Sequence, residues 1–398
     1  MTAAEVQSPL RRLLWQRDKK LYITCAVIGL VQLALRSVMK SRAAANFAVQ
    51  YLVRPFHQLT GVISSILPFS LAEVCWIGLI LFCLWYAVRT VWFLFVPPPR
   101  YAGIKVKKGT RPPDVEVTAG LRVSVLWRRL FGAFTIAFGI YTAFTLLWGL
   151  VYYTDTFEEK AGIDVQPVTV EELAATTRLF AEKVNAAAPL VQHVEPGKLT
   201  GDMDAIFAAS DTLYDILADT YPFLTEDDIR PKQLSPFFSH IMSTIHYTGF
   251  FFPFTGEANL NIDAPECLVP STIAHEIAHM HGIAPEQTAN FVAVLACDTC
   301  GDPLYAYSGY LMGYIHLSNA LYEASYDQWH EVASLLCTEA NQDLRANNEY
   351  WQHFDSSVAD TADSTYSAFL QSYDQPLGSK SYGAVVDLLV AYYGRAQA

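Results

Sequence analysis

The chain has 398 residues, of which 52% are hydrophobic and only 17% are charged, a composition too apolar for an ordinary soluble enzyme of this size. Its net charge of −12 is uneven, because a basic N-terminal third precedes an acidic remainder. The later part has no face rich in Lys and Arg, so the sequence argues against nucleic-acid binding.

The first apolar segment follows a basic N-terminus. Residues 21–39 are apolar except for Gln32 and Arg36. This stretch predicts a membrane-spanning helix in which Arg36, near its end, reaches toward the headgroups. A signal peptide cleaved at residues 43–45 is the alternative. Lys40 and Arg42 stand just before those alanines and favour an uncleaved span.

Two more apolar segments predict a second span over residues 71–96 and a third over 130–153. Residues 97–129 between them form a basic loop. By the positive-inside rule, this loop and the N-terminus lie in the cytoplasm. Residues 1–153 are therefore predicted to be a three-span membrane anchor, and residues 154–398 an extracytoplasmic domain. Residues 56–67 are predicted to form a helix that lies on the membrane surface.

Residues 154–398 have the pattern of one mainly helical domain. Helical periodicity predicts helices over residues 168–187, 202–218, 236–248, 303–324, 328–346 and 385–393. Residues 250–262 are β-like instead, and an extended edge can hold a peptide by strand addition. In that segment Asn259 and Asn261 are predicted to point outward and bind a substrate backbone. An aromatic plug in the cleft floor is the alternative for this segment.

The most informative pattern is His275-Glu276-x-x-His279, the H-E-x-x-H sequence of zinc hydrolases. On a helix the two histidines share one face and can bind one ion. Glu276 is then the candidate general base. A surface helix whose His and Glu face solvent is the alternative, but the flanking residues are apolar and argue for a buried site.

A third zinc ligand is expected shortly after this motif. Gly282 permits the helix to end, and Pro285 can open a second helix at its first position. That arrangement places Glu286 close to the two histidines, as the third ligand of a Zn²⁺ ion that keeps one position for water. Asn290, one turn later, is a candidate to orient a ligand histidine. The oxyanion donor is sought among Tyr310, Tyr307, His246 and His316.

The cysteines leave two interpretations open. Cys297 and Cys300 form a C-x-x-C pair, but no second pair accompanies it, which argues against a structural zinc knuckle. The pair is either a disulfide in an oxidising compartment or two small hydrophobic residues on a helix.

With these motifs in view, the chain resembles a bacterial family of three-span membrane proteins described as a domain of unknown function with a zinc-protease motif. The resemblance rests on residues 253–261, 275–279, 286–291 and 307–311. Glu286-x-x-Ala-Asn290 also resembles the Glu-x-x-Ala-Asp element of membrane zinc proteases of the prenyl-protease type. That likeness implies Glu286 as third ligand and Asn290 in place of the Asp that supports a ligand histidine.

The sequence therefore predicts a mainly α protein: three transmembrane helices followed by an extracytoplasmic, mostly helical zincin-like domain with a small β edge. We expect the protein to be a membrane-anchored zinc metallopeptidase with Zn²⁺ as cofactor. Its expected partners are a peptide or protein substrate and membrane lipid. One alternative is a zinc amide hydrolase that acts on lipid or cell-wall substrates. Another is a catalytically silent membrane sensor or scaffold.

Overall fold

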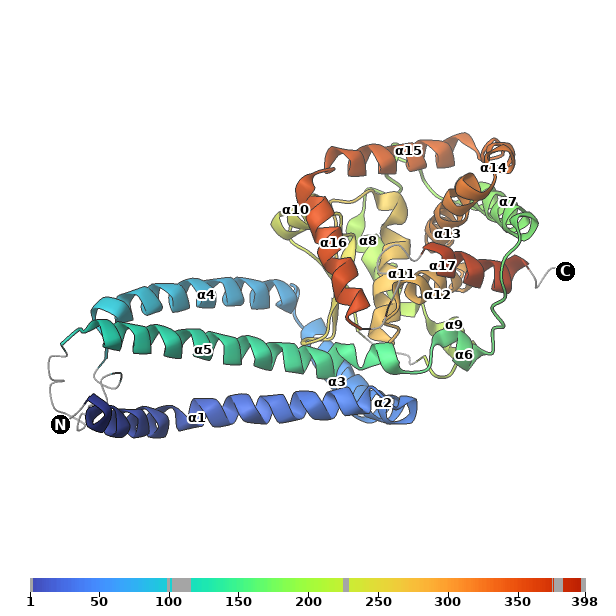
Figure 1. Ribbon diagram of the computed structural model, residues 1–398. Coiled ribbons are helices and arrows are strands. Elements are labelled where there is room, and N and C mark those ends of the chain that lie inside the picture. Colours follow the sequence, from blue (N-terminus) through green and yellow to red (C-terminus); the bar gives the residue numbers. More distant parts are fainter. Residues whose placement is uncertain are drawn as a thin grey trace. The chain divides into compact units, whose positions relative to one another are not determined.

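The computed structural model describes residues 3–98, 101, 116–224, 229–373, 375 and 382–394 (Figure 1). About half of the predicted basic loop, residues 99–100 and 102–115, therefore lies outside the described residues. The chain divides into two compact units, which we call unit 1 (residues 1–41 and 74–147) and unit 2 (residues 42–73 and 148–398). Residues 42–73, which the sequence analysis assigned to the anchor, are grouped with unit 2.

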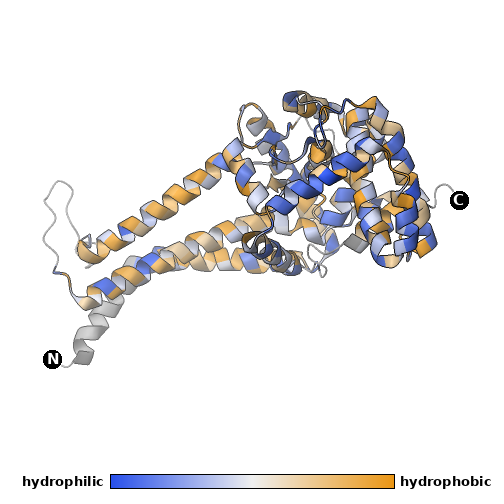
Figure 2. Cartoon of the chain, turned by 90° about the horizontal axis from the view of Figure 1, so that it is seen from above, coloured by the Kyte–Doolittle hydropathy of each residue, from blue (hydrophilic) through white to orange (hydrophobic). Residues whose placement is uncertain are grey.

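Unit 1 consists mainly of long helices, α1 (Ala3–Val38), α4 (Leu71–Phe95) and α5 (Ala119–Phe144). Among the described residues, three helical stretches are long and apolar enough to cross a membrane: Asp18–Val38, Leu71–Phe95 and Ala119–Gly149. The hydropathy colouring of Figure 2 shows how predominantly apolar these helices are. This confirms the predicted mainly α fold with three candidate spans, while the side of the membrane on which each end lies stays a prediction.

The third span differs from its prediction at the N-terminal end. The helix begins at Ala119 rather than at residue 130, and the Thr118 side chain accepts a hydrogen bond from the backbone N–H of Leu121. The arginines expected in a loop lie in this helix and have partners. Arg128 pairs with Asp18 at 2.9 Å, and Arg129 donates to the Thr90 hydroxyl at 2.9 Å. Because the charge of Arg128 is paired and the guanidinium of Arg129 is hydrogen-bonded, the helix can include both.

Unit 2 is built from many helices around a small sheet. In chain order its helices are α2 (Arg42–Ala48), α3 (Arg54–Ser65), α6 (Phe157–Ala161), α7 (Val170–Ala187), α8 (Met203–Ala208), α9 (Asp215–Thr220), α10 (Pro236–Thr244), α11 (Val269–Met280), α12 (Glu286–Thr299), α13 (Pro303–Ala324), α14 (Tyr326–Ala333), α15 (Thr338–His353), α16 (Ser357–Gln371) and α17 (Tyr382–Leu389). Short π and 3-10 turns join several of them, among them Val49–Val53, Thr145–Gly149, Val151–Tyr153, Ala188–Leu190, Ala209–Thr212, Glu266–Leu268 and Val390–Gly394.

The predicted helices of this unit are found with adjusted ends. α13 has the predicted bounds, and α7 begins with a capping box in which Thr169 and Glu172 bond reciprocally. The segments 202–218 and 328–346 are each split into two helices. α16 had no counterpart in the prediction, and it proves to carry a residue of the candidate site.

The sheet has three short strands, β1 (Lys232–Gln233), β2 (Gly249–Phe252) and β3 (Glu257–Leu260), in the order β1-β3-β2. β3 pairs in parallel with β1 and antiparallel with β2. The predicted β segment is thus a hairpin of β2 and β3. Because β3 lies between β1 and β2, only β2 of this hairpin forms an edge of the described sheet.

The core of unit 2 surrounds α12. This helix packs against α11, α13 and α17, and most of its residues are fully buried. Small residues permit close helix packing: a Cβ added at Gly309 of α13 would lie 2.3 Å from the Cβ of Cys297 on α12. The two helices that carry the zinc motif therefore lie in a rigid interior, not on a surface.

Candidate metal site

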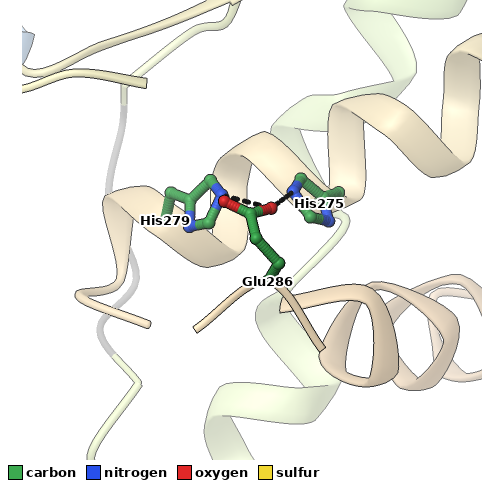
Figure 3. Close-up of side chains that lie close together, drawn as sticks. All are labelled: His275, His279 and Glu286. Carbon is green, nitrogen blue, oxygen red and sulfur yellow. Dashed lines mark ion pairs between the residues drawn. The ribbon is translucent and has the colours of Figure 1, made fainter. Parts of the chain in front are cut away.

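The structure brings His275, His279 and Glu286 together (Figure 3). Both histidines lie on α11, and Glu286 is the first residue of α12. The Oε2 atom of Glu286 is 3.1 Å from Nε2 of His275 and 3.6 Å from Nε2 of His279. The three candidate ligand atoms all lie within 4.8 Å of one another. One carboxylate oxygen thus faces two imidazole nitrogens.

The turn between α11 and α12 creates this arrangement. α11 ends at Met280, and Gly282 adopts a positive φ of 79°, which favours glycine. The Gly282 N–H donates to the His279 carbonyl at 3.0 Å, and the Ile283 N–H donates to the Ala278 carbonyl at 3.2 Å. Pro285 precedes the first helical residue instead of occupying that position as predicted. The tight turn folds Glu286 back over the histidines.

The orientation of His279 suits a metal ligand. Its Nδ1 lies 2.6 Å from the Ile283 carbonyl, which fixes the tautomer with the proton on Nδ1 and leaves Nε2 as a lone-pair donor. The ring of Trp148 packs edge-on against it with centroids 5.5 Å apart. Zinc bonds of about 2.05 Å at the tetrahedral angle separate two ligand atoms by about 3.3 Å. The 3.1 and 3.6 Å separations bracket that value, so the donor set fits zinc.

The charges of the site favour a cation between these three side chains. Burial by itself raises the pKa of Glu286, yet the two imidazoles bring it well below its usual value. Burial opposes a charged His279, but the carboxylate of Glu286 raises the pKa of this imidazole to about 9. The positive charge that this carboxylate requires can be supplied by a proton or by a divalent metal ion.

Glu276 points to the sheet side of the site. It is 3% exposed, and its Oε2 has no hydrogen-bond partner among the described residues. Burial raises the pKa of Glu276 to about 6, against the effect of the two imidazoles. A Cβ added at Gly249 of β2 would lie 2.7 Å from Oε1 of Glu276. Glycine at position 249 therefore lets the edge strand approach the candidate base.

One residue of the site was not predicted from the sequence. The Tyr366 hydroxyl, on α16, donates a hydrogen bond to Oε1 of Glu286, the oxygen that does not face the histidines. The Tyr247 ring lies 5.8 Å from the Tyr366 ring, and burial and nearby carboxylates raise the pKa of Tyr247 to about 12. No local pattern links positions 286 and 366, so only the packing of α16 reveals this contact.

The predicted substrate-binding asparagines have structural roles instead. Asn259 is fully buried and accepts a hydrogen bond from the Ser70 hydroxyl at 2.6 Å. Asn261 is also buried and donates to the Ser243 hydroxyl at 2.9 Å. They lie in and beside the central strand, not an outward edge. Asn290 is partly buried on α12, and the partner of the His279 ring is the Ile283 carbonyl instead.

The predicted oxyanion donors are dispersed. Tyr310 donates to Asp298, which lies about 18 Å along α12 from its first residue, so the structure does not bring Tyr310 to the site. Tyr307 donates to Asp343 at 2.7 Å, and the imidazole of His246 lies 3.6 Å from Asp355. Burial, followed by the charge of His275, lowers the pKa of His316 to about 4.

A family model described as protein of unknown function (DUF3810) matches residues 49–390. Comparison with the curated proteins and with the solved structures found no match. The matched range includes the whole candidate metal site and the second and third apolar helices. The family description assigns no activity, so any function has to be inferred from the residues of the site.

Proposed function

The chain belongs to the family described as protein of unknown function (DUF3810), and we propose from its site that it is a membrane-anchored zinc-dependent metallopeptidase. The observation that carries the proposal is the convergence of His275, His279 and Glu286, with the carboxylate of Glu276 buried beside them. An ion held by three protein ligands keeps a position open for water or substrate, which is typical of catalytic rather than structural zinc.

His275, His279 and Glu286 would hold the zinc. When bound, zinc supplies Lewis-acid polarisation of a carbonyl group and lowers the pKa of a coordinated water. Glu276 is the group of this chain that would accept the proton of the attacking water and deliver it to the leaving amine. Its burial suits that role, and within the described part of the chain no side chain competes for its Oε2.

The substrate would lie along β2. This strand has one free edge, and Gly249 brings that edge within reach of the Glu276 carboxylate. An extended peptide added to an edge strand forms backbone hydrogen bonds that do not depend on its sequence. Tyr366 would hold the Glu286 carboxylate in place through the oxygen that faces away from the histidines.

We also propose that unit 2 acts at the outer side of the cytoplasmic membrane. The basic N-terminus and the basic residues before and within the start of α5 favour the cytoplasm, because positive residues near spans are retained there. Three spans then leave residues after 153 on the outside. Acidic residues soon after the third span, among them Asp155 and Glu159, agree with this side.

The decisive experiment uses the full chain purified in detergent micelles, analysed for zinc content and for cleavage of mixed synthetic peptides. We expect about one zinc per chain and peptide cleavage that falls about 10²- to 10⁴-fold in Glu276→Gln, with zinc retained. Zinc with hydrolysis of lipid or cell-wall amides but not peptides would favour the amide hydrolase. A chain that binds no zinc would overturn the proposal and favour the silent scaffold.

A further inference from the structure

One cavity of unit 2 takes no part in the proposed chemistry. It has a volume of about 490 Å³ and is enclosed by α2, α3, α6 and the segment that joins α11 to α12. Four of its lining residues, Asn46, Gln50, Arg54 and Gln58, are spaced four apart along the chain. On continuous helical turns such residues share one face. A stripe of amide and guanidinium groups therefore faces this cavity.

The same helical stretch also exposes large apolar side chains. Phe47, Tyr51, Leu52 and Leu59 are 63%, 58%, 60% and 63% exposed. Val49 and Val53 of this stretch are buried, but a helix on a soluble protein would turn its other large apolar residues to the core as well. Grouped exposed apolar residues of this kind indicate a membrane or partner surface.

Two basic residues of the cavity lie near each other. Arg54 and Lys160 both line it, and both contact Phe223: Arg54 donates to its carbonyl at 3.0 Å, and the Lys160 ammonium lies 5.8 Å from its ring centroid. Burial and then the like charge of Arg54 lower the pKa of Lys160. The carboxylate in the lining, Asp155, is held by the Asn46 amide at 2.7 Å. Two cations that repel each other across one cavity are suited to an anion.

The position of this stretch in the chain indicates the source of that anion. The first apolar span ends at Val38 and α2 begins at Arg42; α3 ends at Ser65 and the second span begins at Leu71. The longer of these links, residues 66–70, can extend about 18 Å at most. The exposed apolar residues are therefore tethered at both ends to helices that can cross a membrane, and a lipid is the anion that such a surface meets.

We propose that this cavity binds the phosphate group of an anionic phospholipid. Arg54 and Lys160 bind the phosphate, the amides of Gln50 and Gln58 bind further headgroup oxygens, and the acyl chains lie along the exposed face that includes Leu52. The inference is independent of the peptidase proposal. It assigns the α2–α3 stretch a specific lipid contact in addition to its place between two spans.

The test is native mass spectrometry of the full chain in non-ionic detergent micelles, titrated with phosphatidylglycerol, phosphatidylcholine or inorganic phosphate. We expect phosphatidylglycerol to bind most tightly. At about 1 kcal/mol for each basic residue near an anionic lipid, Arg54→Gln/Lys160→Gln should weaken its binding about 30-fold. The matched control Arg178→Gln/Lys198→Gln removes two exposed, ion-paired charges of unit 2 and should bind like wild type.

Any one of three results would overturn the proposal. The double variant could bind phosphatidylglycerol as tightly as wild type, or the control variant could lose as much phosphatidylglycerol binding as the double variant. Inorganic phosphate could also bind wild type as tightly as the lipid does. Should the double variant not fold, Lys160→Gln alone decides, because it keeps the Arg54 bond to the Phe223 carbonyl. The single variant should weaken binding about fivefold. Unchanged binding would refute the assignment.

Discussion

Replacing Glu286 by Gln should weaken zinc binding by about two to three orders of magnitude. The substitution keeps the size of the side chain and removes the charge that faces both imidazoles at 3.1 and 3.6 Å. Four-ligand structural zinc sites bind with about 10–16 kcal/mol, or about 3–4 kcal/mol for each ligand. The loss of one ligand therefore raises the dissociation constant about 10²- to 10³-fold.

This affinity is measured at neutral pH by competition with a fluorescent zinc chelator, using the full chain in detergent micelles. His279→Ala should weaken binding as strongly, because it removes another candidate ligand of the same set. Glu323→Gln, which changes an exposed carboxylate of α13, is the matched control and should bind zinc like wild type. A dissociation constant for Glu286→Gln within about threefold of wild type would refute the assignment of Glu286 as a ligand.

Three further outcomes are expected. Tyr366→Phe removes the hydrogen bond to the Glu286 carboxylate and should weaken zinc binding about 10- to 100-fold in the same competition assay. Unchanged zinc affinity would show that Tyr366 does not support Glu286 as a ligand. Gly309→Ala places a methyl group 2.3 Å from the Cβ of Cys297. It should lower the free energy of unfolding of unit 2 by about 1–3 kcal/mol in denaturant titrations. The control Gly383→Ala has open space around the new methyl group and should leave this free energy unchanged. Burial lowers the pKa of His57 from 6.5 to about 4, so the unfolded chain binds its proton first. The contribution of His57 to stability should therefore fall as the pH drops below about 6.5, by about 2 kcal/mol at pH 5 and by about 3 kcal/mol below pH 4. Burial lowers the pKa of His281 and of His316 as well, so His57→Asn should remove only the His57 share of the pH dependence between pH 7 and 5, and an unaltered slope would refute this contribution.

The proposed catalytic and lipid sites make different demands on the same fold. The metal site depends on a turn of a few residues between two buried helices, where Gly282 takes its positive φ. The lipid cavity depends on residues that are remote in the chain, since Arg54 and Lys160 come from α3 and α6. Loss of zinc binding and loss of lipid binding are therefore separable by substitution, which lets each proposal fail alone.

The sequence by itself determined the features that depend on local spacing and composition. Long apolar stretches indicate three spans because no other structure satisfies the backbone in lipid over such lengths. The helical period places His275 and His279 on one face, and a glycine shortly after them permits the turn that returns Glu286. That this helix begins already at Ala119 was not anticipated, because the sequence does not show that Arg128 pairs with Asp18.

Only the tertiary structure decided which distant residues complete the site. Tyr366 contacts Glu286 because α16 brings this side chain to the first residue of α12, and Gly249 approaches Glu276 because β2 packs against α11. The same packing buried Asn259 and Asn261, which alternation along a strand placed outward. Periodicity fixes which residues of one element share a face. Which element covers that face is set by the packing of all elements together, so a residue many positions away leaves no local signal.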